Sequence, residues 1–272
     1  MKTHSYSPMG MINSLWRNVA LVSALVKRDV IGRYKGSVIG IVWSFLHPVF
    51  MLAVYTFVFS IVFNARWGSG SDSKLEFALV LFSGLVVFNL FSECVSRAPS
   101  LVLSNVSYVK RIVFPLEILP WVVMGSALFH ALISLLVWFI FYSVFFGVPQ
   151  ITVFLFPVVI LPLLLLTMGF SWFLSSLGVY LRDVAQFVSI IIPALLFLSP
   201  IFYPVSALPE SYQLILHINP LTPAIEQVRS VLIWGNQPAW DVYIIYLSVA
   251  SIIAWGGFAW FQHTRRGFAD VL

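Results

Sequence analysis

Long stretches without any charged side chain constrain this chain of 272 residues more than any other feature. The five longest cover residues 36–65, 77–92, 118–181, 184–209 and 242–264. About 20 consecutive apolar residues cross the hydrocarbon core of a bilayer, and a chain that is 60% hydrophobic has more apolar surface than a soluble domain buries. Because the runs are continuously apolar rather than alternating, they predict an all-α integral membrane protein and not a membrane barrel.

The number of crossings follows from the breaks between these runs. The run at 118–181 is long enough for two spans, and the segment FFGVPQ at 145–150 is the only turn-like break in it. We therefore predict six transmembrane helices, at residues 38–63, 75–96, 119–146, 151–179, 184–203 and 241–262. Together they make one transmembrane domain at residues 38–262.

The positions of Lys and Arg orient the predicted spans. With six spans both termini lie on the same side, and that side carries twelve of the 15 Lys and Arg residues. Only Arg66, Lys74 and Arg229 fall on the other side. Because positive residues collect on the cytoplasmic side, both termini are predicted to be cytoplasmic. The net charge of +5 is then explained by topology, and no nucleic-acid partner is predicted.

The predicted cytoplasmic parts include an N-terminal arm at residues 1–37 and a tail at residues 263–272. Within the arm, residues 13–31 show apolar positions at helical spacing, which predicts an amphipathic helix lying on the membrane surface. Leu21 and Leu25 interrupt its polar face. The apolar face would be formed by Leu15, Val19, Val22, Val26 and Val30.

Two connecting segments are too apolar to be simple solvated loops. The cytoplasmic segment SRAPSLVLSNVSYVKRIVFPLE, at 96–117, predicts a short helix parallel to the membrane that ends at Pro115. On the outer side, prolines divide residues 203–240 into two apolar pieces, near 210–218 and 222–234, each too short to cross a bilayer. These pieces predict a re-entrant helical hairpin at about 205–238, before the last span. Glu226 and Arg229, three residues apart on its second piece, are expected to pair.

Catalytic and metal-binding patterns are absent from the sequence. The ten acidic residues are scattered, and the five histidines lack metal-ligand spacing. We therefore predict no catalytic site, no metal site and no cofactor bound by this chain. His47 and His130 lie inside predicted spans, where a hydrogen bond to a neighbouring helix is expected rather than a proton relay. No G-x-x-x-x-G-K-[ST] loop is present, so ATP and its magnesium would be bound by a separate subunit.

Several strings, in this order, resemble the permease subunits of bacterial polysaccharide ABC exporters of the type-2 fold, from about residue 20 to the end. The resemblance is closest to exporters of lipid-linked O-antigen, with capsular polysaccharide and teichoic acid exporters as alternatives. The strings are KRDVIGRYKGSVIGIVWSFLHPVFMLAVYTFVFSIVF, NVSYVKRIVFPLE, YLRDVAQFVSIIIPALLFLSPIFYP, NPLTPAIEQVRSVLIWG and the closing RRGFADVL. They are similar to the family's interfacial arm and first span, first cytoplasmic loop, fifth span with its preceding turn, outer hairpin and tail.

The resemblance implies a pore-forming permease rather than an enzyme. It implies a homodimer in the bacterial inner membrane, driven by two copies of a cytoplasmic ATPase, with a polyprenyl-pyrophosphate-linked polysaccharide as substrate. The residues expected to couple to the ATPase are Asn105, Lys110, Arg111, Arg182 and Asp183. The alternative for Lys110 and Arg111 is simple positive-inside anchoring. Asp183 is an acid on the basic side, so a partner such as Arg182 or an ATPase residue is expected for it.

Aromatic side chains of two predicted spans suit a sugar pathway, because a sugar ring presents apolar C–H faces to them. Aromatic residues also collect at membrane interfaces and in helix packing, which is the alternative for each position. The expected pore-lining residues are Trp43, Phe45, Tyr55 and Phe59 in the first span and Phe197, Phe202 and Tyr203 in the fifth.

The segment GRYKG, between the predicted surface helix and the first span, is expected to gate the entry of a lipid headgroup. Gly32 and Gly36 allow the chain to turn into the bilayer. Arg33 and Lys35 would meet the pyrophosphate at membrane-lipid headgroup level, and Tyr34 would stack on the first sugar or anchor the interface. The alternative is that these cations only set the topology.

Two other function classes are disfavoured by the sequence. A non-ABC transporter driven by protons would require paired intramembrane acids or an inverted repeat, and the sequence shows neither. A membrane-embedded sugar transferase would require clustered acidic residues or metal ligands on one side of the membrane, and these are absent as well.

Overall fold

The computed structural model describes residues 7–58, 67, 74–109 and 114–272. Within them every element of regular secondary structure is a helix, which confirms the predicted all-α class. Long, uninterrupted runs of apolar residues favour helices, since a helix satisfies its backbone hydrogen bonds internally wherever lipid excludes water.

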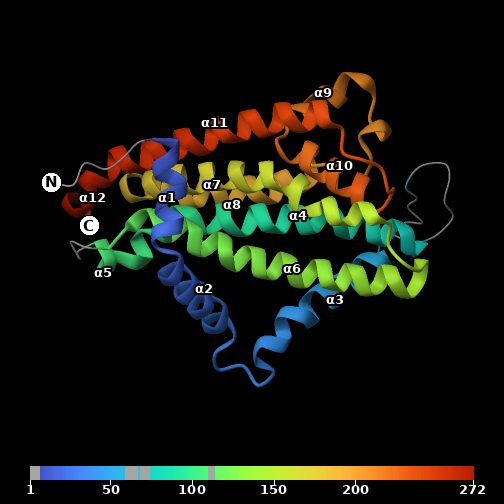
Figure 1. The fold of residues 1–272 in the computed structure, drawn as a ribbon, viewed down its shortest axis with the longest axis horizontal. Helices are drawn as coiled ribbons and strands as arrows, with labels where there is room; N and C mark the ends of the chain where they lie inside the picture. Colours follow the sequence, from blue (N-terminus) through green and yellow to red (C-terminus); the bar gives the residue numbers. More distant parts are fainter. Residues whose placement is uncertain (1–6, 59–66, 68–73, 110–113) are drawn as a thin grey trace.

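Four long helices lie side by side and form the body of the molecule (Figure 1). They are α4 (Lys74–Leu101), α6 (Leu119–Phe146), α7 (Phe156–Tyr180) and α11 (Trp240–Thr264). α4 is the central one, because it packs against α6 and α7 and against two shorter helices, α8 (Asp183–Leu198) and α10 (Leu221–Leu232). In the most apolar stretch of α4, 83% of the residues are buried inside the protein.

Five helical stretches of the described residues are long and apolar enough to cross a membrane. They cover 40–58, 75–101, 116–146, 151–180 and 240–271. They correspond to the first, second, third, fourth and sixth predicted spans. The bounds predicted for α6 and α11 agree with the structure to within two residues.

The fifth predicted span, 184–203, is shorter in the structure. α8 has 16 residues, about 24 Å at 1.5 Å per residue, against roughly 30 Å for a bilayer core. It ends because Ser199 is extended (φ −100°, ψ 150°), as is typical before a proline, here Pro200. Residues 199–203 are a turn, so the predicted helical end at 203 is wrong. The second predicted span errs in the other direction, because α4 continues past 96 and through Pro99.

The first predicted span begins as the short η1 (Gly40–Val42) and continues as α3 (Trp43–Tyr55). Its predicted end, at 59–63, lies outside the described residues. α2 (Val19–Tyr34) and α3 lean away from the main bundle and meet in a loop that projects from it (Figure 1). α2 packs on α6, through Val22 and Leu25 of α2.

The N-terminal arm contains two helices where the sequence predicted one. α1 (Pro8–Arg17) ends at Asn18, whose backbone (φ −117°, ψ 17°) is not helical, and α2 starts at the next residue. Within α2, Val19 is 50% exposed whereas Val22 and Val30 are buried. The predicted single helix over 13–31 is therefore wrong, and the contact of its apolar face with a membrane stays a prediction.

The two apolar pieces predicted after the fifth span are both helices. α9 (Glu210–Ile218) follows the short η6 (Val205–Ala207), and α10 follows α9 after Asn219 and Pro220. α10 is packed against α4 and α7, whereas α9 exposes several large apolar side chains. The helical state of both pieces is as predicted, and the re-entrant hairpin stays a prediction.

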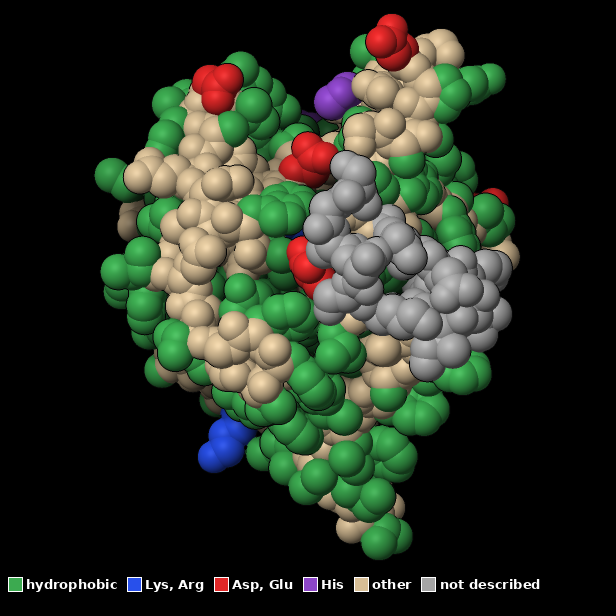
Figure 2. Space-filling model, turned by 90° about the vertical axis from the view of Figure 1, so that its right-hand side faces the viewer, with side chains coloured by type: hydrophobic (Ala, Val, Ile, Leu, Met, Phe, Trp, Pro, Cys, Tyr) green, Lys and Arg blue, Asp and Glu red, His purple; other side chains and the backbone are tan. Residues whose placement is uncertain are grey.

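Of the segments predicted to be cytoplasmic, α2 and the projecting loop leave the bundle nearer its middle, and three others gather at one end (Figure 1). α1, α5 (Val106–Val109) and α12 (Phe268–Val271) lie there, and the hairpin lies at the other end. Figure 2 shows that other end, where visible Lys and Arg side chains are scarce among the described residues. The compartment that each end faces stays a prediction.

The remaining short elements join the long helices. Residues 96–117 form the end of α4, η3 (Leu103–Asn105), α5 and the start of η4 (Leu116–Ile118), with 110–113 outside the description. The predicted single helix in this segment is therefore divided. η5 (Ile151–Leu155) precedes α7, and η7 (Arg265–Gly267) joins α11 to α12.

Candidate functional site

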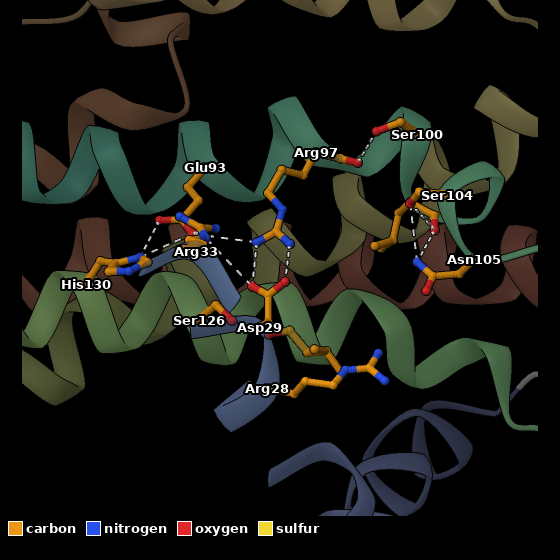
Figure 3. A network of polar contacts seen from close by, with 12 residues as sticks. Arg28, Asp29, Arg33, Glu93, Arg97, Ser100, Ser104, Asn105, Ser126 and His130 are labelled. Atoms are coloured by element: carbon orange, nitrogen blue, oxygen red, sulfur yellow. Dashed lines mark hydrogen bonds and ion pairs between the residues drawn. The ribbon is translucent and has the colours of Figure 1, made fainter. Parts of the chain in front are cut away.

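Five ionisable side chains from three helices meet beside the projecting α2–α3 pair (Figure 3). We call them the charged cluster. The members are Asp29 and Arg33 of α2, Glu93 and Arg97 of α4, and His130 of α6.

Helical spacing explains how the cluster assembles. Asp29 and Arg33 are four residues apart on α2, and Glu93 and Arg97 are four residues apart on α4. Side chains at this spacing lie one turn apart on the same face of a helix. α2 and α4 thus each present one acid and one base on a single face. Both helices pack on α6, and these two faces point toward each other.

The two arginines bind the acids of the opposite helix. Arg97 donates from Nη1 and Nη2 to both carboxylate oxygens of Asp29, at 2.9 and 2.7 Å. Arg33 donates from Nη2 to Oε1 of Glu93, while its Nε lies 3.9 Å from Oδ2 of Asp29. Arg97 Nη1 also lies 3.8 Å from Glu93 Oε1. Two cations and two anions therefore balance in one partly buried network.

His130 completes the cluster from α6. Its Nδ1 lies 3.0 Å from Glu93 Oε2, and its Nε2 lies 3.2 Å from the hydroxyl of Tyr34. Because an ionised carboxylate only accepts hydrogen bonds, Nδ1 carries the hydrogen, and a neutral ring accepts the Tyr34 hydroxyl at Nε2. This confirms the expectation that His130 is hydrogen-bonded to a neighbouring helix.

The electrostatics of Asp29 show how firmly α2 is tied to α4. Partial burial opposes the charged form of this carboxylate, but the hydrogen bonds and positive charge of Arg97 outweigh it and hold the pKa of Asp29 below its usual value. The Asp29–Arg97 link is therefore ionised at neutral pH. It stabilises the folded state above the unfolded pKa of Asp29 and is lost only as the pH falls through the lower folded value.

Two cavities lie on either side of the cluster. The larger, about 360 Å³, is lined by Arg33, Tyr34, His47, Glu93 and His130 together with small polar side chains of α3, α4 and α6. The smaller, about 220 Å³, lies between α2 and the α4–α5 segment. Arg28 lines the smaller one and points away from the cluster, donating to the Tyr108 hydroxyl at 2.9 Å. The cluster thus separates a cavity near the α2–α3 loop from one near α5.

Comparison with known proteins places this arrangement in a family. Residues 20–233, from the start of α2 to the end of α10, match the family described as ABC-2 type transporter. The chain belongs to this family. The resemblance to type-2 ABC exporters is thereby confirmed, and the cluster, both cavities and the hairpin all fall inside the matched part.

Individual relatives match between about four fifths of the chain and nearly all of it. The chain is similar to an O-antigen export system permease protein RfbA of Myxococcus xanthus, 25% identical over 264 residues, which are 96% of this chain and 99% of the relative. An RfbA of Klebsiella pneumoniae is 26% identical over 256 residues, 93% and 95% of the two chains. The polysialic acid transport protein KpsM of Escherichia coli is 24% identical over 219 residues, 79% and 81%.

The expected gate residues of this family member divide into two groups. Arg33 belongs to the charged cluster and Tyr34 is hydrogen-bonded to its member His130, whereas Lys35 is exposed in the projecting loop. Gly36 adopts a φ of +90°, which confirms that a glycine is needed for the turn. Gly32 is helical, within α2, so the chain leaves the helix after Tyr34 rather than at Gly32.

The expected pore aromatics of the fifth span gather with one residue of the first. The Phe202 ring lies 6.4 Å from that of Tyr55 and 5.6 Å from that of Phe197, measured between centroids. Tyr203 donates its hydroxyl to the Phe197 carbonyl at 2.7 Å. These contacts tie α3 to the turn after α8, and the lining of a pore stays a prediction.

The other expected pore and coupling residues are more scattered. Trp43 and Phe45 are exposed on α3, away from the contacts of Tyr55 described above, and Phe59 lies outside the described residues. Lys110 and Arg111 also lie outside them.

Three expected coupling residues are described. Asn105 donates to the Leu101 carbonyl at 2.9 Å and so caps the end of α4. Arg182 and Asp183 are exposed at the start of α8, and no ion pair joins them among the described residues. The expected Arg182 partner is thus not found. Asp183 instead occupies the first turn of α8, where a negative charge complements the helix dipole.

The expected pair in the outer hairpin is wrong as well. Glu226 is exposed, and in the described part of the chain Arg229 forms no ion pair with it. Arg229 is 1% exposed and donates to the carbonyls of Val80, Pro200 and Ile201, at 3.1, 2.5 and 2.9 Å. It lies on the buried face of α10, and carbonyls left open by the turn after α8 satisfy its donors.

The sequence interpretation missed most of the charged cluster. No site role is predicted for Asp29, Glu93 or Arg97, because the sequence of each helix alone does not show that α2 and α4 meet. The i, i+4 acid–base spacing on both α2 and α4 was the available signal, together with a histidine within the third span.

Proposed function

We propose that this chain is the permease subunit of an ATP-driven exporter that carries lipid-linked polysaccharide, O-antigen first, from the cytoplasm across the bacterial inner membrane. The observation that carries the proposal is the match to O-antigen export permeases over almost the full length of both chains. ABC-2 family membership argues against the non-ABC transporter and the sugar transferase. Similarity to KpsM keeps capsular polysaccharide as the second candidate, followed by teichoic acid.

The proposed partners are an ATPase, which would bind one end of the bundle, and a second copy of this chain, which would bind its side. Two copies of a cytoplasmic ATPase would dock at the end that holds α5 and the start of α8, and would bind the ATP and magnesium. A second copy of this chain would complete the pore. Exposed aromatic side chains on α3 and α8, such as Phe50 and Phe187, both 63% exposed, support a surface that faces another copy or membrane lipid.

The proposed entry point for the pyrophosphate of the substrate is the α2–α3 loop. The 360 Å³ cavity beside it is lined by Arg33 and by hydroxyl and amide groups that suit a polar ligand. Replacing Arg33 and Lys35 together by Gln is expected to abolish export at matched membrane levels of permease. Replacing Lys27 and Arg28 by Gln is expected to reduce export less. Equal, mild losses in both variants would leave only a topological role for these cations.

Deletion of the gene for this chain tests the proposed function. The deletion strain is expected to lose one surface polysaccharide and to accumulate the same polymer, still linked to polyprenyl pyrophosphate, inside the cell. A plasmid copy is expected to restore export. The nature of the lost polymer distinguishes O-antigen from capsule and teichoic acid. A strain that lacks the internal lipid-linked polymer as well would indicate a biosynthetic enzyme and would contradict the proposal.

A further inference from the structure

Arg33 is already occupied by a carboxylate in this structure. The side chain proposed to receive the substrate pyrophosphate donates instead to Glu93, beside the larger cavity. An incoming phosphate that binds Arg33 through Nη2 must therefore compete with Glu93 for that nitrogen. The cost of separating Arg33 from Glu93 depends on the other contacts of the two acids, Glu93 and Asp29.

The remaining contacts show that Arg33 can leave without stranding either acid. Glu93 keeps the hydrogen bond from His130 at 3.0 Å and lies 3.8 Å from Arg97. Asp29 keeps both of its hydrogen bonds from Arg97. A buried carboxylate without a partner is strongly unfavourable. Both Glu93 and Asp29 keep a partner when the Arg33 side chain moves away. The same is not true of Arg97, whose departure would remove both hydrogen bonds to Asp29.

We propose that Glu93 is an internal competitor for Arg33 that keeps the phosphodiester headgroups of ordinary membrane lipids out of the gate and yields to a diphosphate. This inference rests on the proposed function. A phosphodiester carries one negative charge, like the carboxylate, so exchanging one for the other brings little electrostatic gain. A diphosphate diester carries two charges, and Arg33 with the exposed Lys35 attracts it more strongly.

Binding of the diphosphate then also loosens the gate. Arg33 lies in the last turn of α2, so its release from Glu93 removes one contact of the helix end that leads into the projecting loop, while the Tyr34–His130 hydrogen bond remains. Asp29, one turn earlier, remains tied to α4 through Arg97. Small polar groups of Ser44, Asn89 and Ser92 line the same cavity and are available to the phosphate oxygens.

The test measures lipid binding to the full-length permease in nanodiscs. The probe is a polyprenyl diphosphate that carries one sugar, and the competitor is phosphatidylglycerol, which carries one phosphodiester charge. For the wild type we expect diphosphate binding that phosphatidylglycerol barely disturbs. For Glu93→Gln we expect severalfold tighter binding in neutral nanodiscs and clear competition by phosphatidylglycerol. Glu93→Asp, with a shorter reach, is expected to shift in the same direction by less. This second variant keeps the test decisive if Glu93→Gln fails to fold.

Two further variants separate competition from a structural role. Glu210→Gln makes the same chemical change on exposed α9, at the other end of the bundle, and is expected to change nothing. The exchange Arg33→Glu with Glu93→Arg restores an ion pair with its polarity reversed. We expect this double variant not to bind the diphosphate, and to melt below the wild type because the exchanged acid lies beside Asp29 and the exchanged base beside Arg97. Restored binding in the exchange variant would mean that the pair is only structural, and would overturn the inference.

The outcomes also separate this inference from the proposed function. If the wild type binds the diphosphate and Arg33→Gln does not, but Glu93→Gln binds no tighter than the wild type, the competitor role is wrong and the gate stands. If the wild type itself does not bind the diphosphate probe, the proposed gate is wrong and the competitor role falls with it.

Discussion

At the scale of single residues, Arg229 shows how a charge is accommodated in an apolar interior. Its guanidinium satisfies carbonyls of α4 and of the turn after α8, and its Cζ lies 4.2 Å from the centroid of the Trp67 ring. The contacts join the outer hairpin to two other segments. Arg229 therefore has a structural role, because it links α10 to α4 and to the turn after α8, although the sequence suggested a local pair with Glu226.

Replacing Arg229 is expected to lower the free energy of unfolding. Arg229→Met keeps much of the apolar stem but removes the donor to the Pro200 and Ile201 carbonyls, which costs about 3 kcal/mol and lowers the melting temperature in detergent by roughly 6–12 °C. Arg266→Met removes an exposed arginine and serves as the control. Equal melting temperatures for the two variants would contradict the role given to Arg229.

Gly84 provides an independent test of the same site. A Cβ at this position of α4 would lie 2.8 Å from Nη2 of Arg229, and the guanidinium cannot withdraw because its carbonyl partners hold it. Gly84→Ala is expected to destabilise the protein by about 1–3 kcal/mol. Gly256→Ala, on α11, meets no atom within 4 Å and is expected to be neutral or stabilising by up to about 1 kcal/mol. Thermal unfolding of both variants measures the difference, and a stable Gly84→Ala protein would refute this packing.

At the scale of elements, the sequence predicted those helices whose ends carry a local signal. α6 and α11 end close to the predicted positions, and α9 and α10 are separated where the prolines indicated. The break at Asn18 and the early end of α8 were not predicted. Arg17–Asn18 and Ser199–Pro200 were the local signals for them, but apolar residues continue on both sides of each. The charged cluster escaped for a different reason: its geometry depends on how α2, α4 and α6 pack, and no single helix records that.

The outer hairpin allows a test of membrane depth. Leu214, Ile215 and Ile218 of α9 are exposed on the isolated chain although they are apolar, which is expected if lipid or a second copy covers them. Single cysteines at these positions, in a variant lacking the buried Cys94, should react slowly with a large water-soluble maleimide added from outside. A cysteine at position 210 is the water-exposed reference. Fast labelling at all four positions would identify an ordinary external loop.

At the scale of the whole molecule, the two ends of the bundle have different characters. One end carries α1, α5 and α12 with the start of α8, and the other carries the apolar hairpin (Figures 1 and 2). The charged cluster lies between them, where the α2–α3 pair leaves the bundle. This arrangement suits a chain that receives an anionic lipid headgroup from the side and passes a polymer toward the hairpin, with the energy supplied from the α5 end by a partner.

The most direct test is transport by the purified components in proteoliposomes. The permease, its partner ATPase and a labelled polyprenyl-diphosphate-linked polysaccharide are combined, and both ATP hydrolysis and the appearance of polymer on the far side are measured. We predict transport only when permease, ATPase and ATP are all present, and no hydrolysis by the permease alone. ATP turnover by the isolated chain, or polymer transport without any ATPase, would contradict the account.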